Sequence, residues 1–243
     1  MDLGLTGRIA VVTGGTRGIG AETVRLLGEE GATAVAVSRS NGIDVTALDA
    51  ADQILERLDG RAPDILVNNA GTSYAKPLGE LSEEDWELQW DLNVMASMRL
   101  MRAFVPQMAE RGWGRVVNVA SSAGKRPSLT NAAYSVGKAA QASLSRVFAD
   151  SYGDRGVLVN SVSPGPVASE LWMADGGLAD QTAQARGLTR EASIEVQAGK
   201  TTLNRFGTPE EIASVVVFLC SERAADVTGA NWSVDGGTVA TIV

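Results

Sequence analysis

The feature that most constrains this chain is a glycine-rich turn near its start, Thr13-Gly14-Gly15-Thr16-Arg17-Gly18-Ile19-Gly20. It joins an apolar run, Ile9–Thr13, to a helical pattern, Ile19–Glu30. Glycines let the backbone turn tightly and approach a bound group without a Cβ in the way. The start of the helix adds free N–H groups and the positive end of a dipole, which suit a phosphate. The turn predicts an α/β fold that binds a phosphate-bearing nucleotide, although glycines also serve ordinary loops.

The rest of the chain repeats this alternation of strand and helix. Further strands are predicted at Thr33–Ser38, Ile65–Asn68, Arg115–Ala120, Val157–Val162 and Asn231–Val234, and further helices at Ser82–Arg111, Ala132–Tyr152 and Pro209–Ser221. Repeated β-α-β units predict a Rossmann-like, doubly wound parallel sheet with helices on both faces. No linker divides residues 1–243, so we expect a single domain. A stretch rich in Gly, Ala and Gln, at about 170–204, predicts a lid over the substrate.

The available side chains limit the chemistry. The chain has no histidine and one cysteine, Cys220. This excludes Ser–His and Cys–His nucleophiles and zinc sites built from His or several Cys, so no metal is expected. Cys220 ends an apolar run and is expected to be a small buried hydrophobe.

Charge and hydropathy limit the partners and the location. A net charge of −8 argues against a nucleic-acid surface. No apolar stretch of about 18 residues predicts a membrane span. The first eight residues lack the pattern of a signal peptide, so we expect a cytoplasmic protein.

A tyrosine and a lysine lie four positions apart in Tyr134-Ser135-Val136-Gly137-Lys138. On a helix this spacing puts both side chains on one face, so the ammonium lies near the phenol. The cation predicts a lowered pKa for Tyr134, which then acts as acid toward a carbonyl or as base toward an alcohol. Ser121, at the end of a strand thirteen residues earlier, can hydrogen-bond the substrate oxygen, with Ser122 as the alternative.

Residues at the end of the second strand bear on the choice of cofactor. An acidic residue there would hold the ribose hydroxyls of NAD. Here Ser38 ends the strand, Arg39 follows, and Arg17 lies in the glycine turn. Two guanidinium groups suit a 2′-phosphate, so NADP(H) is predicted over NAD(H). The alternative is that both arginines are solvated surface residues.

These motifs, in this order, resemble the short-chain dehydrogenase/reductase family. The resemblance includes the glycine spacing, Ser121 ahead of Tyr-x-x-x-Lys, and Val234-Asp235-Gly236-Gly237 near the C-terminus. It implies that Asn93 supports a proton relay to Lys138. It also implies cofactor contacts at Gly14, Thr16, Arg17, Gly18, Ile19, Gly20, Ser38, Arg39, Asp44, Val45, Asn69, Ala70, Gly71, Tyr134, Lys138, Pro164, Gly165, Val167 and Ser169. The family usually has threonine at the position of Ser169.

Two segments depart from the family pattern. Only four residues, 40–43, separate Arg39 from Asp44-Val45, where relatives place a helix. The adenine side of the cofactor site is therefore expected to be open, and some NAD-linked dihydrodiol dehydrogenases of the family share this reduced connection. The segment between Ser169 and Arg205 is long, and its Trp172 and Met173 either line a substrate pocket or pack the lid down.

The resemblance implies an NADP(H)-dependent reductase of a ketone or 3-oxoacyl-type carbonyl, similar to 3-oxoacyl-(acyl carrier protein) reductases. Its substrate would be a small molecule, free or carrier-linked. The alternatives are an NAD-dependent dehydrogenase of an alcohol or cyclic diol, and a nucleotide-sensing protein without catalysis. Family members are usually homotetramers built on two long helices. Here those helices carry Gly137, Ala140, Ser143, Ala149, Met95, Met98 and Met101, which could instead pack within one subunit.

Overall fold

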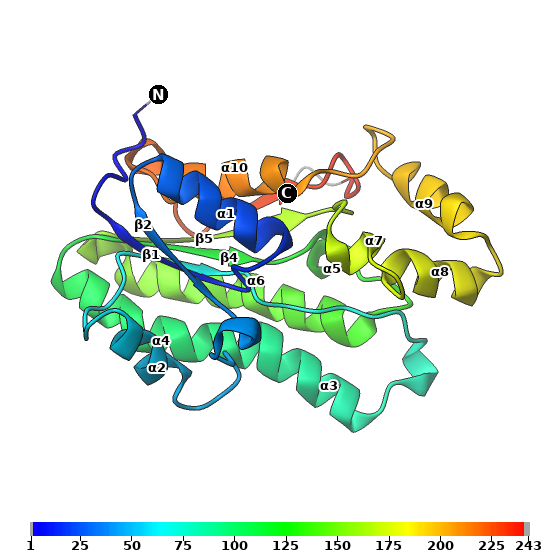
Figure 1. Ribbon diagram of the computed structural model, residues 1–243, viewed down its shortest axis with the longest axis horizontal. Helices are drawn as coiled ribbons and strands as arrows, with labels where there is room; N and C mark the ends of the chain where they lie inside the picture. Colours follow the sequence, from blue (N-terminus) through cyan, green and yellow to red (C-terminus); the bar gives the residue numbers. More distant parts are fainter. Residues whose placement is uncertain (1, 241–243) are drawn as a thin grey trace.

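The computed structural model describes residues 2–240 as a parallel sheet between two layers of helices (Figure 1). The six strands, in spatial order, are β2 (Thr33–Val37), β1 (Ile9–Thr13), β3 (Ile65–Asn68), β4 (Gly114–Val119), β5 (Val157–Pro164) and β6 (Asn231–Val234). Each neighbouring pair is parallel. Because the strands are parallel, the loops after their carboxyl ends all emerge at one edge of the sheet. The doubly wound α/β fold predicted from the sequence is confirmed.

Two apolar cores lie on the two faces of the sheet. On one face α1 (Gly18–Glu29) and α10 (Pro209–Leu219) pack over one set of strand side chains. On the other face lie α2 (Ala50–Arg57), α4 (Ala96–Glu110) and α6 (Ala132–Tyr152). Successive strand residues point to opposite faces, and both faces are covered, which is why β1, β2 and β3 are almost uniformly apolar.

The long helix predicted at Ser82–Arg111 is interrupted. It consists of α3 (Glu83–Trp90), a π-helical segment η3 (Asp91–Met95) and α4. Ser82 caps α3 as predicted, and its hydroxyl accepts a hydrogen bond from the backbone N–H of Asp85. A π-helical turn shifts the hydrogen-bond register within a helix, often at functional sites.

The connection after β2 also differs from expectation. It contains a 3-10 turn, η1 (Arg39–Asn41), and then α2, a helix that the sequence analysis did not predict. Most other predicted boundaries differ by one residue; β5 runs to Pro164, two residues beyond the prediction, and α10 ends at Leu219. Short turns complete the chain: η2 (Leu78–Glu80), α5 (Ser122–Lys125), η4 (Gly153–Arg155) and η5 (Glu222–Ala224).

The segment predicted as a lid forms three short helices beyond the carboxyl edge of the sheet (Figure 1). They are α7 (Glu170–Met173), α8 (Leu178–Arg186) and α9 (Arg190–Ala198). Arg190 joins them, because its guanidinium donates to both carboxylate oxygens of Asp180 at 2.9 Å and to the carbonyl oxygen of Met173. Gln181 links α8 to the loop after β3 by accepting from the N–H of Ala75 at 2.9 Å.

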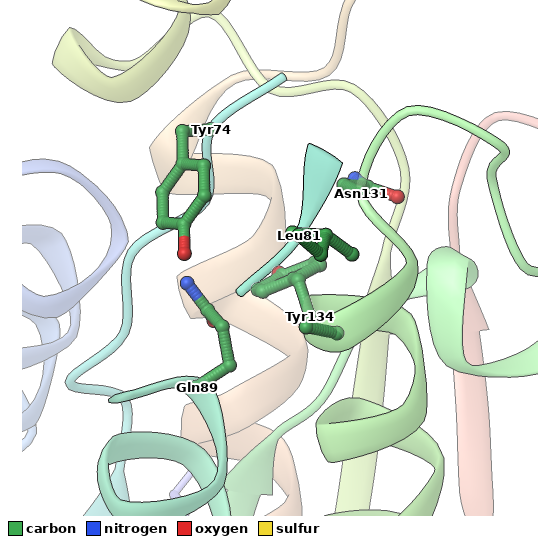
Figure 2. Close-up of a pocket in the computed structure, with 6 residues that line it drawn as sticks. Tyr74, Leu81, Gln89, Asn131 and Tyr134 are labelled. Carbon is green, nitrogen blue, oxygen red and sulfur yellow. The ribbon is translucent and has the colours of Figure 1, made fainter. Parts of the chain in front are cut away.

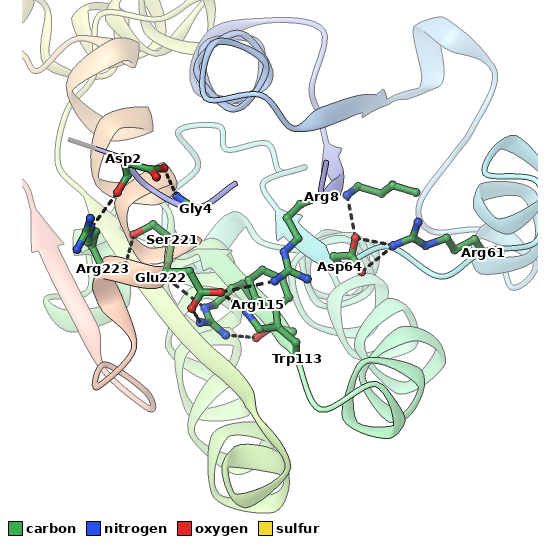
Figure 3. A network of polar contacts seen from close by, with 12 residues as sticks. Asp2, Gly4, Arg8, Arg61, Asp64, Trp113, Arg115, Ser221, Glu222 and Arg223 are labelled. Carbon is green, nitrogen blue, oxygen red and sulfur yellow. Dashed lines mark hydrogen bonds and ion pairs between the residues drawn. The ribbon is translucent and has the colours of Figure 1, made fainter. Parts of the chain in front are cut away.

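The opposite, amino edge of the sheet is held by a polar cluster (Figure 3). The guanidinium groups of Arg8 and Arg115 lie 3.6 and 4.4 Å from the centre of the Trp113 ring. The Trp113 indole donates to Glu222 at 2.8 Å, and Arg115 pairs with the same carboxylate at 3.3 Å. These cation–π and ionic contacts join the start of β1, β4 and the segment after α10. The charged and aromatic side chains of this cluster contact one another, so we interpret the cluster as structural.

Burial of Cys220 is complete and raises the pKa of its thiol to about 12, which confirms the expected small buried hydrophobe. No helix within residues 2–240 has the length and apolar character needed to cross a membrane. In the same residues, no group of three or more acidic or cysteine side chains is placed to hold a metal.

Candidate active site

The glycine turn between β1 and α1 is folded so tightly that it excludes side chains. Gly14 and Gly18 have φ of +62° and +53°, a region that favours glycine. A Cβ on Gly20 would lie 2.2 Å from the carbonyl oxygen of Gly14 and 2.5 Å from the amide nitrogen of Asn69. No side chain caps the start of α1, so its first N–H groups are free. This cradle fits the phosphates of a dinucleotide.

Thr13 and Asn69 lock the turn to the loop after β3. The Asn69 side chain donates to the carbonyl oxygens of Thr13 and Gly14 at 2.9 and 3.2 Å. The Thr13 hydroxyl accepts from the N–H groups of Asn69 and Ala70, both at 3.0 Å. The structure thus brings Gly14, Asn69 and Ala70 together as expected. The role of Thr13 was missed, although its place as the last strand residue before the turn was visible in the sequence.

Three hydroxyl groups meet at the end of β2, where the ribose of the adenosine half would lie. Thr16 and Ser38 are 3.2 Å apart, Ser38 and Ser40 are 2.8 Å apart, and Ser40 and Thr16 are 3.3 Å apart. Arg39 is exposed beside them and makes no ion pair with any residue of the described range. Hydroxyls and a free guanidinium fit a phosphate better than they fit bare ribose hydroxyls. Ser40 was not predicted as a site residue.

Arg17 and Asp44 have partners of their own. Arg17 lies 3.6 Å from the carboxylate of Glu170, at the start of the lid, and both side chains are exposed. Such a pair is weak and leaves the guanidinium available. Asp44 accepts from the N–H and the hydroxyl of Thr46 at 3.0 and 2.8 Å, and these bonds hold its pKa below the usual range. Val45 is buried beneath it.

Tyr134, Lys138 and Ser121 converge at the carboxyl edge of the sheet. Tyr134 and Lys138 lie on the first two turns of α6, and the lysine Nζ is 5.7 Å from the centre of the phenol ring. Ser121 follows β4 by two residues and caps α5, its hydroxyl accepting from the N–H of Ala123 at 3.1 Å. The predicted constellation is therefore assembled in space.

The predicted lowering of the Tyr134 pKa by Lys138 is wrong for the protein without a cofactor. Burial raises the pKa of the Tyr134 phenol, and a hydrogen bond with Ser121 opposes that rise only in part. Lys138 is itself buried, and burial lowers the pKa of its amine to about 7. The prediction required a full positive charge on Lys138, but a desolvated amine loses much of its preference for the charged form.

The buried amine of Lys138 predicts a pH-dependent stability. An unfolded lysine has a pKa of about 10.4, so between pH 7 and pH 10 the unfolded chain binds the proton more tightly than the native protein does. The free energy of unfolding therefore rises with pH through this window. We expect the wild type to gain about 2–4 kcal/mol relative to Lys138→Met between pH 7 and pH 10. Urea unfolding of both proteins at the two pH values measures this, and parallel curves would contradict it.

Asn93 lies in the π-helical segment and is fully buried. Its side-chain amide donates to the backbone and side-chain oxygens of Gln89 at 2.9 and 2.8 Å. A Cβ on Gly71 would lie 3.3 Å from the Asn93 Oδ1 and 3.5 Å from the Lys138 Nζ. The two residues thus face the same open backbone, but they make no direct hydrogen bond.

A small cavity of about 10 Å³ lies against Tyr134, between α3, α6 and the loop after β3 (Figure 2). Tyr74, Leu81, Gln89, Asn131, Ala133 and Tyr134 line it. The Tyr74 hydroxyl points toward the Gln89 amide and donates to Asp85 at 2.8 Å. This volume is about that of one water probe. The sequence analysis missed Tyr74 and Gln89, because nothing in their local pattern separates them from surface residues.

The segment after β5 crosses the front of the glycine turn. A Cβ on Gly165, which follows Pro164, would lie 2.7 Å from the carbonyl oxygen of Asp235. Val167 is buried and pairs with Gly207. Ser169 begins α7, and its Cβ is 3.6 Å from the position that a Cβ on Gly18 would take. The start of the lid therefore lies directly on the predicted phosphate site.

The structure bears on the role of Trp172 and on whether the residues of the two long helices pack within one subunit. Trp172 packs edge-on against Phe206 with ring centres 5.2 Å apart, which favours its packing role. Gly137 lies against Gln89 and Asn93, and Met101 and Ala149 are buried in the core, so these three pack within one subunit. Ala140, Ser143, Met95 and Met98 are half-buried or exposed.

Comparison with known proteins agrees with this geometry. A family model described as enoyl-(acyl carrier protein) reductase matches residues 40–239. The chain is 32% identical to 3-oxoacyl-[acyl-carrier-protein] reductase of Aquifex aeolicus, over 98% of this chain and 99% of that one. It is also 32% identical to D-beta-hydroxybutyrate dehydrogenase of Rhizobium meliloti, over 96% and 99%.

Among solved structures, L-sorbose reductase of Gluconobacter frateurii, complexed with NADPH and L-sorbose, superposes with a TM-score of 0.90. The two chains are 32% identical, and the match covers 100% of each. These matches extend over nearly the whole chain. The chain therefore belongs to the short-chain dehydrogenase/reductase family of oxidoreductases.

Proposed function

We propose that this protein reduces a ketone or 3-oxoacyl-type carbonyl to a secondary alcohol with NADPH. The observation that carries the proposal is the meeting of Ser121, Tyr134 and Lys138 at the edge of the sheet that also bears the glycine cradle. The NADPH and L-sorbose bound by the reductase with the same fold support it. So does the similarity to a 3-oxoacyl reductase.

The residues present divide the work of such a reaction. Bound NADPH would supply the hydride to the substrate carbon. The Ser121 hydroxyl donates a hydrogen bond to the substrate oxygen and holds it beside Tyr134. Tyr134 gives its proton to that oxygen as the negative charge develops, which completes the alcohol. Because burial raises the pKa of Tyr134, the phenol holds its proton at neutral pH and is suited to act as the acid.

The lid has a role in this proposal as well. Helices α7, α8 and α9 are held together by Arg190 and tied by Gln181 to the loop after β3. That arrangement supports a cover that closes over the substrate as one piece and keeps water from the reacting atoms.

Arg39 carries the preference for NADPH in this proposal. Replacing it in Arg39→Ala removes a charge-assisted contact to the 2′-phosphate, so KM for NADPH should rise about tenfold or more while KM for NADH stays unchanged. Arg102→Ala is the matched control, since Arg102 is also exposed and lies on α4, away from the site. Steady-state kinetics with both cofactors measure the effect. An equal change with NADPH and NADH would show that Arg39 does not select the cofactor.

A panel of substrates separates the proposed reaction from its alternatives. Simple ketones, keto sugars, β-keto thioesters, secondary alcohols and cyclic diols would be assayed with NADP(H) and NAD(H). Reduction with NADPH supports the proposal. Preferred oxidation of alcohols with NAD would favour the alternative of an NAD-dependent dehydrogenase. The similarity to D-beta-hydroxybutyrate dehydrogenase supports that alternative. Cofactor binding without turnover of any class would favour the sensing protein.

Assembly and location stay predictions. A groove of about 260 Å³ lies between α3 and α6. Its lining is Trp86, Glu87, Trp90, Ala133 and Val136. Exposed apolar side chains on these helices support the homotetramer expected for the family. The cytoplasmic location is a prediction from the sequence.

A further inference from the structure

A buried glutamine, Gln141, contacts the amine of Lys138. The lysine Nζ donates to the Gln141 Oε1 at 3.0 Å and to the carbonyl oxygen of Val119 at 2.7 Å. Gln141 is fully buried, and Lys138 is 3% exposed. Gln141 lies three residues after Lys138 on α6, so the helix itself places the two side chains together.

The orientation of the Gln141 amide follows from its two partners. The glutamine presents its oxygen to Lys138, and that oxygen accepts from an N–H group that both the neutral and the charged amine possess. Its nitrogen then faces Ser97, and donates to that hydroxyl at 2.8 Å. The Ser97 hydroxyl donates a hydrogen bond to the backbone carbonyl oxygen of Asn93 at 3.3 Å. Each bond fixes the direction of the next, and the chain runs from Lys138 to Asn93 entirely through buried side chains.

The hydrogen bonds to Lys138 determine which position on its amine gains or loses a proton. A neutral amine has two N–H groups, and an ammonium has three. Val119 and Gln141 accept two of them in either state. The third position on the amine is therefore the one that changes between a lone pair and an N–H. The backbone of Gly71 lies near the amine, since a Cβ on Gly71 would be 3.5 Å from Nζ.

We infer that Gln141 is a positioning residue for Lys138, which confines proton exchange on the amine to the side that faces Gly71. Gln141 does this by holding one N–H of Lys138 in the protein interior. The inference deepens the proposed reductase and rests on it, because Lys138 matters to turnover only if the reaction proceeds at Tyr134.

Gln141→Met tests this, since methionine has a similar length and shape and offers only a weak acceptor. Lys138 then loses its partner and can turn away from Gly71. We expect kcat for NADPH-dependent reduction to fall roughly 5- to 20-fold, with KM for NADPH unchanged. Gln141→Glu keeps an accepting oxygen in the same place and should recover most of the lost kcat. Gln107→Met is the control, because the Gln107 amide also donates a hydrogen bond, to the carbonyl oxygen of Ala103 at 3.1 Å, but lies far along α4.

The outcomes separate this inference from the proposed function. If the Tyr134→Phe variant turned over substrate at the wild-type rate, the proposed function itself would be wrong. With Tyr134→Phe inactive, unchanged kcat in Gln141→Met would overturn the inference alone, and so would equal losses in Gln141→Met, Gln141→Glu and Gln107→Met. If Gln141→Met does not fold, Ser97→Ala serves instead, because it frees the Gln141 amide. A fall in kcat at constant KM then supports the inference, and no change contradicts it.

Discussion

Tyr134→Phe should bind NADPH as the wild type does and lose nearly all reductase turnover. The change removes one oxygen atom from a half-buried ring and leaves the packing of α6 intact. Loss of a positioned acid costs about 10²–10⁴-fold in rate, and we expect kcat to fall within that range. NADPH affinity, measured by calorimetry, should stay within about twofold, because only one hydroxyl is lost and the glycine turn, Lys138 and Arg39 are unchanged.

The matched control for this experiment is Tyr152→Phe. Tyr152 ends the same helix and stacks on Phe148 with ring centres 5.9 Å apart. Its loss of a hydroxyl should leave both kcat and affinity unchanged. Retained turnover in Tyr134→Phe would mean that another group supplies the proton, and the reaction proposed for Ser121, Tyr134 and Lys138 would have to be abandoned.

Gly20→Ala should weaken cofactor binding. The added Cβ would lie 2.2 Å from the Gly14 carbonyl oxygen and 2.5 Å from the Asn69 side chain, so the backbone of the turn must move. Such overpacking costs about 1–3 kcal/mol. If this free energy destabilises the conformation of the turn that binds phosphate, NADPH binds about 5- to 150-fold more weakly.

Gly28→Ala is the control on the same helix. Nothing lies within 4 Å of its added Cβ, and Gly28 is an exposed residue in the last turn of α1. Replacing a helical glycine with alanine there should raise stability by about 0.5–1 kcal/mol and leave NADPH affinity unchanged. Calorimetric titration and urea unfolding of both variants separate the two effects. Wild-type affinity in Gly20→Ala would show that the tight turn does not form the cofactor site.

The fold was predictable because its signals are local and repeated. The strands at Ile9–Thr13 and Ile65–Asn68 are short apolar runs, and each is followed by polar or glycine-rich residues that mark the carboxyl edge. The break at Asp91–Met95 carries no such signal, since the apolar pattern continues across it. Helix α2 was missed because its eight residues, with acidic and basic side chains, read as part of a loop.

The site was predictable only at the level of which residues meet. Spacing alone placed Lys138 near Tyr134, because a helix fixes the relation of positions four apart. The protonation of that pair depends on burial by distant strands and helices, which no local pattern reveals. Likewise, Gln141 is visible three residues after Lys138, but its contact with Ser97 requires the packing of α6 on α4.

The turn at Ser38–Asn41 is largely self-contained. The Ser38 N–H donates to the Asn41 side chain at 2.8 Å, and the Asn41 amide returns a bond to the carbonyl oxygen of Ala36 at 2.8 Å. The N–H of Ile43 closes the loop on the Ser38 carbonyl oxygen at 3.0 Å. Outside this stretch the turn contacts the Thr16 hydroxyl and the Arg57 guanidinium, and none of its residues is buried, so four consecutive residues can be exchanged as a cassette without disturbing either core. Redesign of the coenzyme preference of this enzyme can therefore begin with a library confined to a single oligonucleotide.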